Sequence, residues 1–258
     1  MKFASLILLT LIGAQGYASG IHLWFSQNVG CHVKPCNYSV APPDKITSKK
    51  IALTFDDGPS AETTPAILDV LDKHHIKATF FVLGKNVAGN EALLQRMKSR
   101  GHIIGAHSWN HPSFWSLNKE EIDQQIMKTE SALAAIGIYP KFFRFPYGNS
   151  NEYAQALLRK LGYKVVGWNV DTCDWGFNKS GVLSSQNNKI CNGSTATVTD
   201  ALPYLFNKAT ARQGGIILMH DVHEVTARNL DHLLTELEYQ GYDFVQVDDP
   251  AVFPLLNQ

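Results

Sequence analysis

The sequence has no excess of charge of either sign, and this absence excludes several kinds of partner. It contains 23 Lys and Arg residues against 23 Asp and Glu residues, so the formal net charge is zero. Nucleic-acid-binding proteins and proteins that adhere to anionic membranes need clustered positive charge. The chain is also 45% hydrophobic, whereas disorder goes with low hydrophobicity and high net charge. We therefore expect a folded protein with no nucleic-acid partner.

Long hydrophobic runs are absent as well. The apolar run at residues 3–12 is too short to cross a bilayer unaided, where about 20 residues are needed, and we predict no transmembrane segment elsewhere. Lys2 precedes this run and small residues, including Ala18, follow it, an order typical of a secretory signal. We predict a signal peptide over residues 1–18, with cleavage after Gly20 or an uncleaved anchor as alternatives. The protein is then secreted, periplasmic or associated with the cell wall.

The sequence has only four cysteines, in two sequence-local pairs: Cys31 with Cys36, and Cys173 with Cys191. Four cysteines allow three connectivities, which sequence alone does not separate. Because an exported protein meets an oxidising compartment, we favour disulfides 31–36 and 173–191. A metal site at the first pair is the alternative, but only His32 lies close by, and no second pair follows at zinc-finger spacing.

Strand and helix signals alternate along most of the chain. Short apolar runs that end in turn residues predict strands at residues 51–55, 78–83, 102–106, 142–145, 163–170, 216–219 and 244–247. Apolar residues at helical spacing predict helices at residues 64–74, 87–97, 119–136, 152–161, 198–209 and 230–237. This alternation predicts a parallel sheet covered by helices, either a closed barrel or an open doubly wound sheet.

Other segments fit the alternation less well. Residues 19–48 are predicted to form an irregular arm, and residues 176–194 a polar loop. Residues 49–258 then form one catalytic domain. The glycine fingerprint of dinucleotide-binding sheets and the P-loop are both missing from the sequence, which disfavours nucleotide chemistry.

Polar and aromatic residues gather where five predicted strands end. In parallel α/β folds, chemistry is located at the carboxyl ends of the strands. Taken singly, Asp57 could be a turn residue, Arg144 a surface charge and either histidine a structural residue. Together, however, Asp57, His107 and His111 offer three mixed ligands to one divalent metal, the number that catalytic zinc typically takes from protein.

Five motifs occur in a fixed order over residues 50–247: T-F-D-D-G-P-S, H-S-x-x-H-P, R-x-P-Y-G, D-x-x-D-W and L-x-H-D. In this order they resemble the polysaccharide deacetylases of carbohydrate esterase family 4. The resemblance implies an α/β fold, a distorted (β/α)7 barrel in a single domain. It also implies a metal-dependent hydrolase that removes N-acetyl groups from N-acetylglucosamine units of chitin, chito-oligosaccharide or peptidoglycan and releases acetate.

The resemblance implies roles for five residues of the first three motifs. Asp57, His107 and His111 would hold the metal, with Zn²⁺ favoured and Co²⁺ or Ni²⁺ as alternatives. Asp56 would be the general base that takes a proton from the attacking water. Arg144 would orient Asp56 and keep it ionised, because a nearby positive charge lowers the pKa of an acid.

The later motifs supply the other half of the reaction. The backbone N–H of Tyr147 would stabilise the oxyanion. His220 would protonate the leaving amine, and Asp174 would orient His220 and favour its charged form. Trp175 and Leu218 would line a small apolar slot for the acetyl methyl group. These are again roles that the resemblance implies.

Three alternatives remain open from sequence. The same chemistry could act on an O-acetyl ester, as in acetylxylan. A metal site of two histidines and one carboxylate is also found in iron oxygenases. A barrel without catalysis could serve as a glycan-binding module. In each glycan case we expect a monomer with a polysaccharide or oligosaccharide partner.

Overall fold

The computed structural model describes residues 48–191, 194–254 and 256. The predicted signal peptide, the irregular arm and the Cys31–Cys36 pair lie outside the described residues. Across the described part of the chain, no helix combines the length and the apolar character needed to cross a membrane.

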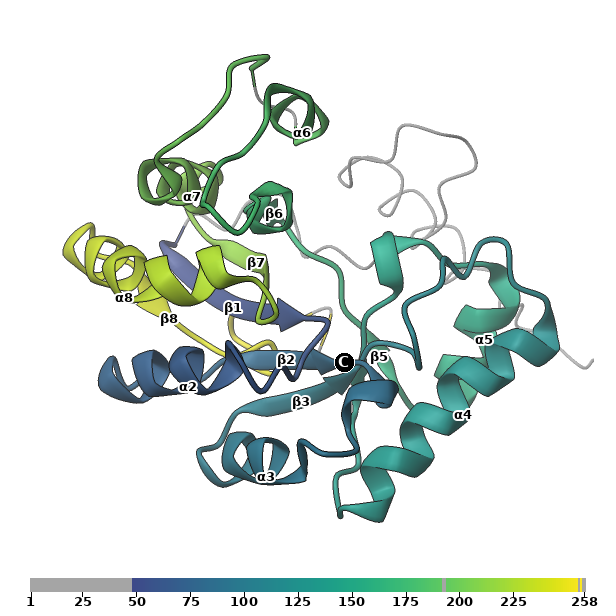
Figure 1. Ribbon diagram of the computed structural model, residues 1–258. Helices are drawn as coiled ribbons and strands as arrows, with labels where there is room; N and C mark the ends of the chain where they lie inside the picture. Colours follow the sequence, from purple (N-terminus) through teal and green to yellow (C-terminus); the bar gives the residue numbers. More distant parts are fainter. Residues whose placement is uncertain (1–47, 192–193, 255, 257–258) are drawn as a thin grey trace, which may run out of the picture.

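A single parallel sheet organises the described residues (Figure 1). Its strands are β1 (Lys50–Asp56), β2 (Thr79–Val82), β3 (Ile103–Ala106), β4 (Phe142–Phe143), β5 (Lys164–Val165), β6 (Val170–Asp171), β7 (Gly215–His220) and β8 (Asp243–Phe244). The strands are ordered β5-β4-β3-β2-β1-β7-β6, and β8 pairs with the start of β1. The predicted α/β class and single domain are therefore confirmed, as a curled parallel sheet.

Helices cover the outside of this sheet (Figure 1). They are α2 (Thr64–Lys73), α3 (Glu91–Ser99), α4 (Lys119–Ala135), α5 (Glu152–Lys160), α6 (Ser185–Ile190), α7 (Ala201–Thr210) and α8 (Glu224–Tyr239). Three short 3-10 turns follow strand ends: η1 (Gly84–Asn86), η2 (Pro146–Gly148) and η3 (Asp174–Gly176).

The structure corrects three of the predicted elements. The predicted strand at 163–170 is two strands, β5 and β6, because the buried Arg144 guanidinium binds the carbonyls between them and takes the place of strand pairing. The predicted helix at 87–97 begins only at Glu91, since Gly89 adopts a φ of 85°. The predicted polar loop at 176–194 contains α6, which Ser184 caps and which has no apolar period to reveal it.

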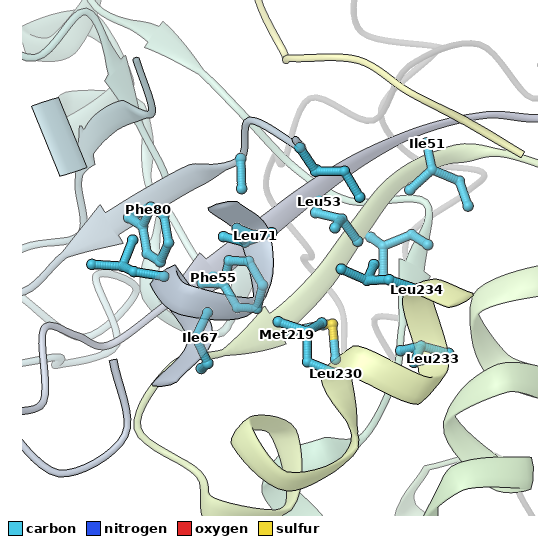
Figure 2. Packing of buried hydrophobic residues seen from close by; sticks show 14 of the residues in the cluster. Ile51, Leu53, Phe55, Ile67, Leu71, Phe80, Met219, Leu230, Leu233 and Leu234 are labelled. Carbon is cyan, nitrogen blue, oxygen red and sulfur yellow. The ribbon is translucent and has the colours of Figure 1, made fainter. Parts of the chain in front are cut away.

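The alternation of side chains along β1 explains why the chain buries both faces of the sheet. Ile51, Leu53 and Phe55 point outward and pack against helices α2 and α8 (Figure 2). The residues between them, which include Thr54 and Asp56, point to the opposite face, because successive strand residues alternate. Helices cover one face of the parallel sheet, and the other face encloses the interior. Almost every residue of β1 is therefore buried.

The same alternation on β3 and β7 brings chemistry to the interior. Ile217 and Met219 pack outward in the main core, so Leu218 and His220 face inward. His107 follows β3 directly, and the same alternation points its side chain to the inner face of the sheet. Asp56 and His220 are also register partners on neighbouring strands, which places a carboxylate and an imidazole side by side at the mouth of the sheet.

Candidate active site

Asp56 lies at the centre of a buried polar cluster. The Arg144 guanidinium, which is fully buried, donates from Nη1 to Asp56 Oδ1 at 2.8 Å and to Thr54 Oγ1 at 2.7 Å. Its other nitrogens bind the carbonyls of Val166 and Gly167. Burial raises the pKa of Asp56 and outweighs the opposing effect of Arg144. The lowering that we expected from Arg144 is present, but the net direction is upward.

Asp57, His107 and His111 converge at one point. One ligand atom from each lies within 4.8 Å of the others. Asp57 Oδ1 is 3.5 Å from His107 Nε2 and 3.3 Å from His111 Nε2. The fold therefore brings together three residues that the sequence motifs place on two separate loops.

The backbone brings Asp57 into this cluster although it directly follows Asp56. Successive residues of a strand point to opposite faces. Asp57, however, adopts a φ of 76°, outside the strand conformation. The Asn86 side chain fixes this turn by donating from Nδ2 to the Asp57 carbonyl at 2.7 Å. Both carboxylates consequently reach the mouth of the sheet.

The donor set of this cluster fits a divalent cation. His107 Nδ1 donates to the Arg144 carbonyl at 2.7 Å, which leaves the lone pair of Nε2 facing the cluster. Burial lowers the pKa of His107 to about 3 and also lowers the pKa of His111, so both rings are neutral at neutral pH. Asp57 Oδ1 is buried and has no hydrogen-bond partner among the described residues. Two neutral imidazoles and a carboxylate oxygen without a hydrogen-bond partner form a donor set of the kind that divalent cations take from proteins.

Asp174 and His220 form a second, fully bonded unit. The His220 ring donates from Nδ1 to Asp174 Oδ1 at 2.8 Å, and the His220 backbone donates to Oδ2 at 2.7 Å. The Thr226 hydroxyl donates to Oδ2 at 2.6 Å, and the Trp175 backbone to Oδ1 at 2.9 Å. Burial alone would lower the pKa of His220, but Asp174, with smaller contributions from Asp56 and Asp57, raises it to about 10.

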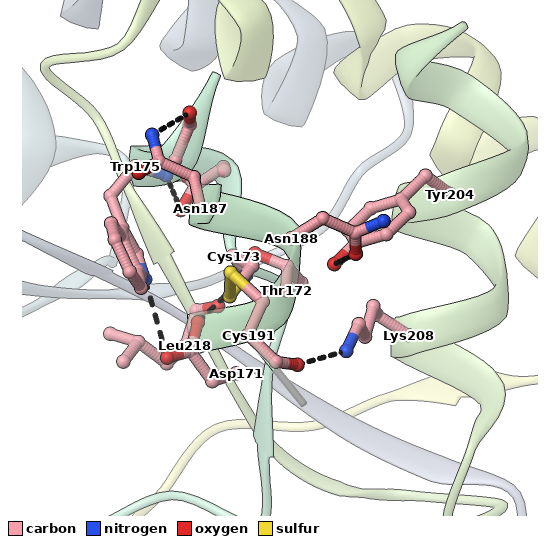
Figure 3. The surroundings of a disulfide bond; sticks show 12 residues. Asp171, Thr172, Cys173, Trp175, Asn187, Asn188, Cys191, Tyr204, Lys208 and Leu218 are labelled. Atoms are coloured by element: carbon pink, nitrogen blue, oxygen red, sulfur yellow. Dashed lines mark hydrogen bonds between the residues drawn. A yellow bond between two sulfur atoms is a disulfide. The ribbon is translucent and has the colours of Figure 1, made fainter. Parts of the chain in front are cut away.

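Trp175 and Leu218 lie on the same side of the Cys173–Cys191 disulfide (Figure 3). The indole of Trp175 donates from Nε1 to Asp171 Oδ2 at 3.3 Å, which fixes the orientation of the ring. Leu218 is 5% exposed and faces inward from β7. The predicted 173–191 disulfide is therefore confirmed; it joins the residue next to Asp174 to the end of α6.

Tyr147 lies in the turn η2 with a φ of 58°. Its ring is 64% exposed and meets the His111 ring edge-on, with the ring centroids 4.5 Å apart. The backbone hydrogen bonds of this turn are donated by its neighbours Gly148 and Asn149 to the carbonyls of Phe145 and Pro146. The turn thus places the ring of Tyr147 against the ring of His111.

Comparison with known proteins agrees with this geometry. Residues 44–166 match the family model described as polysaccharide deacetylase. PgdA, a peptidoglycan-N-acetylglucosamine deacetylase of Listeria monocytogenes, is 40% identical over 208 residues, which are 80% of this chain and 40% of that protein. A peptidoglycan-N-acetylglucosamine deacetylase of Bacillus cereus is 34% identical over 221 residues, 84% of this chain and 72% of that protein.

A solved structure extends the comparison to a fungal enzyme. The chitin deacetylase of Colletotrichum lindemuthianum matches with a TM-score of 0.65 and 32% identity, over 78% of this chain and 87% of that chain. The chain belongs to the polysaccharide deacetylase family. This confirms the resemblance that the five motifs indicated, and the relatives named above are deacetylases, which are hydrolases. The chain spans 40% of the length of the Listeria relative.

The ten site residues that the sequence suggested lie at or after the ends of strands β1, β3, β4, β6 and β7. The motifs gave no sign of several residues that support them. Three supporting residues lie outside every motif: Asn86, Gln125 and Thr226. Each forms a hydrogen bond with a candidate site residue or with the loop that carries one. A single sequence carries no signal for such partners, because their function depends on contacts made across the fold.

Proposed function

We propose that this chain removes N-acetyl groups from N-acetylglucosamine units of a polysaccharide and releases acetate. The observation that carries the proposal is the pairing of two units at one mouth: the cluster of Asp57, His107 and His111, and the bonded pair of Asp174 and His220. Hydrolysis of an acetamide needs both, because the carbonyl must be polarised and the amine must leave protonated.

The metal requirement is part of this proposal. Asp57, His107 and His111 would hold one divalent cation, with Zn²⁺ favoured over Co²⁺ or Ni²⁺ for two imidazoles and a carboxylate. When bound, such a cation supplies Lewis-acid polarisation of the acetyl carbonyl and lowers the pKa of water. The unpaired Asp57 Oδ1 and the neutral rings of both histidines support this assignment.

The chain's own groups would move the protons. Asp56 is the proposed base: its raised pKa favours proton uptake, and Arg144 fixes its orientation. His220 is the proposed acid, since Asp174 keeps it protonated through neutral pH. The backbone N–H of Tyr147 is the proposed oxyanion donor, and Trp175 with Leu218 is the proposed contact for the acetyl methyl group.

The substrate polymer is the finer part of the proposal. The relatives named above are a chitin deacetylase and deacetylases of N-acetylglucosamine in peptidoglycan, and both substrates present the same acetamide. A chain with zero net charge suits a neutral sugar. We further propose that the protein works outside the cytoplasm as a monomer, after loss of residues 1–18, and that residues 49–258 form its catalytic domain.

A panel of acetylated glycans tests the proposal. Chitin oligomers, peptidoglycan fragments and acetylxylan are incubated with the protein, and the products are identified by mass spectrometry together with an assay of free acetate. We expect loss of acetyl groups from an N-acetylglucosamine substrate. Release from acetylxylan alone would establish the O-acetyl esterase instead. Tight glycan binding without release of acetate from any substrate would establish a binding module.

A further inference from the structure

We propose that Gln125, on α4 and outside all five motifs, is a positioning residue for the loop that carries His111. The inference rests on the metal site proposed above. The loop, residues 108–111, leaves β3 and turns back over the mouth of the sheet. Ser108 has a φ of 72° and His111 a φ of 69°. Non-glycine residues keep this left-handed conformation only where surrounding contacts hold them.

The side chain of Gln125 makes three hydrogen bonds to the tip of this loop. Its Oε1 accepts from the backbone N–H groups of Trp109 at 2.9 Å and Asn110 at 3.2 Å. Its Nε2 donates to Asn110 Oδ1 at 2.8 Å. The Gln125 side chain therefore bonds two consecutive backbone N–H groups and also the Asn110 side chain. Both bonded residues lie between Ser108 and His111, the two residues with positive φ.

The opposite side of the loop is held by backbone. The N–H of Gly84 donates to the Ser108 carbonyl and that of Lys85 to the Trp109 carbonyl, each at 3.0 Å. A Cβ on Gly84 would lie 2.6 Å from the Trp109 ring and 2.7 Å from Thr129 Oγ1. The loop is thus clamped between η1 and α4, and Gln125 is the part of the clamp that a side-chain substitution can remove.

The other two ligands are held more directly. His107 is anchored through its own ring, by the Arg144 carbonyl at 2.7 Å, and Asp57 through its own carbonyl, by Asn86 at 2.7 Å. The backbone N–H of His111 donates to Ser108 Oγ at 3.0 Å, a contact within the loop that does not attach the loop to the barrel. Apart from its edge-on contact with the Tyr147 ring, the position of His111 relative to the other proposed ligands therefore depends on the contacts that η1 and Gln125 make with the loop.

The test measures metal affinity with no substrate present. Metal-free protein is titrated with Zn²⁺ against a chromogenic chelator, and the thermal midpoint of the metal-free form is recorded for each variant. Gln125→Met keeps the length and helix propensity of glutamine but removes both the acceptor and the donor. Gln124→Met makes the same change at the exposed neighbouring position on α4. Gln125→Glu keeps the accepting oxygen, and the Asn110 amide can turn to donate to the second oxygen.

We expect Gln125→Met to weaken Zn²⁺ binding about 10- to 100-fold, the usual effect of losing an outer-shell partner. Gln124→Met and Gln125→Glu should stay within about threefold of wild type in Zn²⁺ affinity. The metal-free thermal midpoint of Gln125→Met should fall only modestly below that of Gln124→Met, because the loop tip is partly exposed and water can replace the lost hydrogen bonds. Gln125→Ala provides a second loss variant, should the methionine disturb the loop by its bulk.

Two results would overturn the inference while leaving the proposed function intact: both loss variants binding Zn²⁺ like Gln124→Met, or Gln125→Glu losing as much affinity as Gln125→Met. Failure of the wild-type protein to bind Zn²⁺ would instead overturn the metal site itself, and with it this role for Gln125.

Discussion

The two halves of the site differ in how completely their polar groups are satisfied. In the acid half, made of Asp174 and His220, the carboxylate accepts four hydrogen bonds from His220, Trp175 and Thr226. In the metal half, made of Asp56, Asp57, His107 and His111, Asp57 Oδ1 is buried and has no such partner among the described residues. A buried polar atom without a partner is costly. The acid half is thus preorganised by the protein alone, whereas the metal half, under the proposed function, would be completed by a cation.

The supports of the two halves also differ in kind. The acid half is held by side chains that bond the reacting groups themselves, and the disulfide secures the residue next to Asp174. In the metal half, Arg144 and its carbonyl hold the side chains of Asp56 and His107. Asp57 and His111 are instead held through the backbone of their loops, where Asp57, Ser108 and His111 have positive φ angles. Substitutions in the acid half should therefore act on stability and proton transfer, and those at Asp57, at the two histidines or at their supports should act on metal affinity.

The largest expected effect concerns the base. Asp56→Asn cannot take up a proton, so we expect acetate release to fall by about 10²–10⁴-fold. Zn²⁺ affinity should change little, since Asp56 is bound by Arg144 rather than assigned as a ligand. Acetate assays and Zn²⁺ titrations on the same preparation check both. Asp57→Asn is the control that should lose activity and affinity together, and an active Asp56→Asn variant would remove Asp56 from the mechanism.

The second prediction concerns the acid half and its pH dependence. The pKa of His220 is raised to about 10 in the folded protein, against about 6.5 for an unperturbed histidine. Its protonation therefore contributes stability that is complete below about pH 6.5 and is lost as the pH rises through about 10. Asp174→Asn should destabilise the protein by roughly 3 kcal/mol near pH 6, and this difference from wild type should shrink toward pH 10 in denaturant unfolding.

Thr226→Val provides the matched control for that series. It removes one of the four donors to Asp174 but keeps the charged pair. Its unfolding free energy should follow the wild-type dependence on pH. A pH-independent difference between wild type and Asp174→Asn would show that the pair is not ionised in the folded protein.

The third prediction concerns the disulfide of the acid half. Replacing Cys173 and Cys191 together by Ser opens a link across 18 residues, which the chain-entropy model values at about 3 kcal/mol. We expect a lower thermal midpoint and weaker activity, because Asp174 and Trp175 follow Cys173 directly, but unchanged Zn²⁺ affinity. Unchanged activity and thermal stability would show that the disulfide does not position these residues.

The smallest expected effect concerns Asn86 in the metal half. Asn86→Leu removes the donor to the Asp57 carbonyl at similar side-chain volume. We expect Zn²⁺ affinity to fall about tenfold, while metal-free stability falls by only about 1 kcal/mol. Titration and denaturant unfolding separate the two quantities. Equal losses in both would mean that Asn86 supports the fold in general rather than the Asp57 turn.

Much of the fold could be predicted because apolar runs typical of strands alternate along the sequence with apolar residues at helical spacing. The runs around Phe55, Phe80 and Met219 are continuous and apolar, as strands buried on both faces must be. Elements without such a pattern were missed or merged. The six-residue α6 is polar, and the boundary between β5 and β6 is set by Arg144, which is distant in sequence.

The candidate site could be predicted as far as its residues lie in local motifs at strand ends. The convergence of Asp57, His107 and His111 follows from parallel strands that end at one edge of the sheet. The positive φ of Asp57 and the clamp by Gln125 could not be foreseen, since both depend on contacts with η1 and α4. The upward pKa shift of Asp56 was also missed, because burial of the carboxyl group outweighs the effect of the neighbouring Arg144 charge.

The most direct test of the contrast between the halves is acetate release before and after metal removal. The protein is stripped with a chelator, assayed on an N-acetylglucosamine oligomer, and assayed again after one equivalent of Zn²⁺ is restored. We predict no release from the stripped protein, recovery on addition of Zn²⁺, and an unfolding profile that keeps the pH dependence of the His220–Asp174 pair throughout. Full acetate release from the metal-free protein would contradict the account.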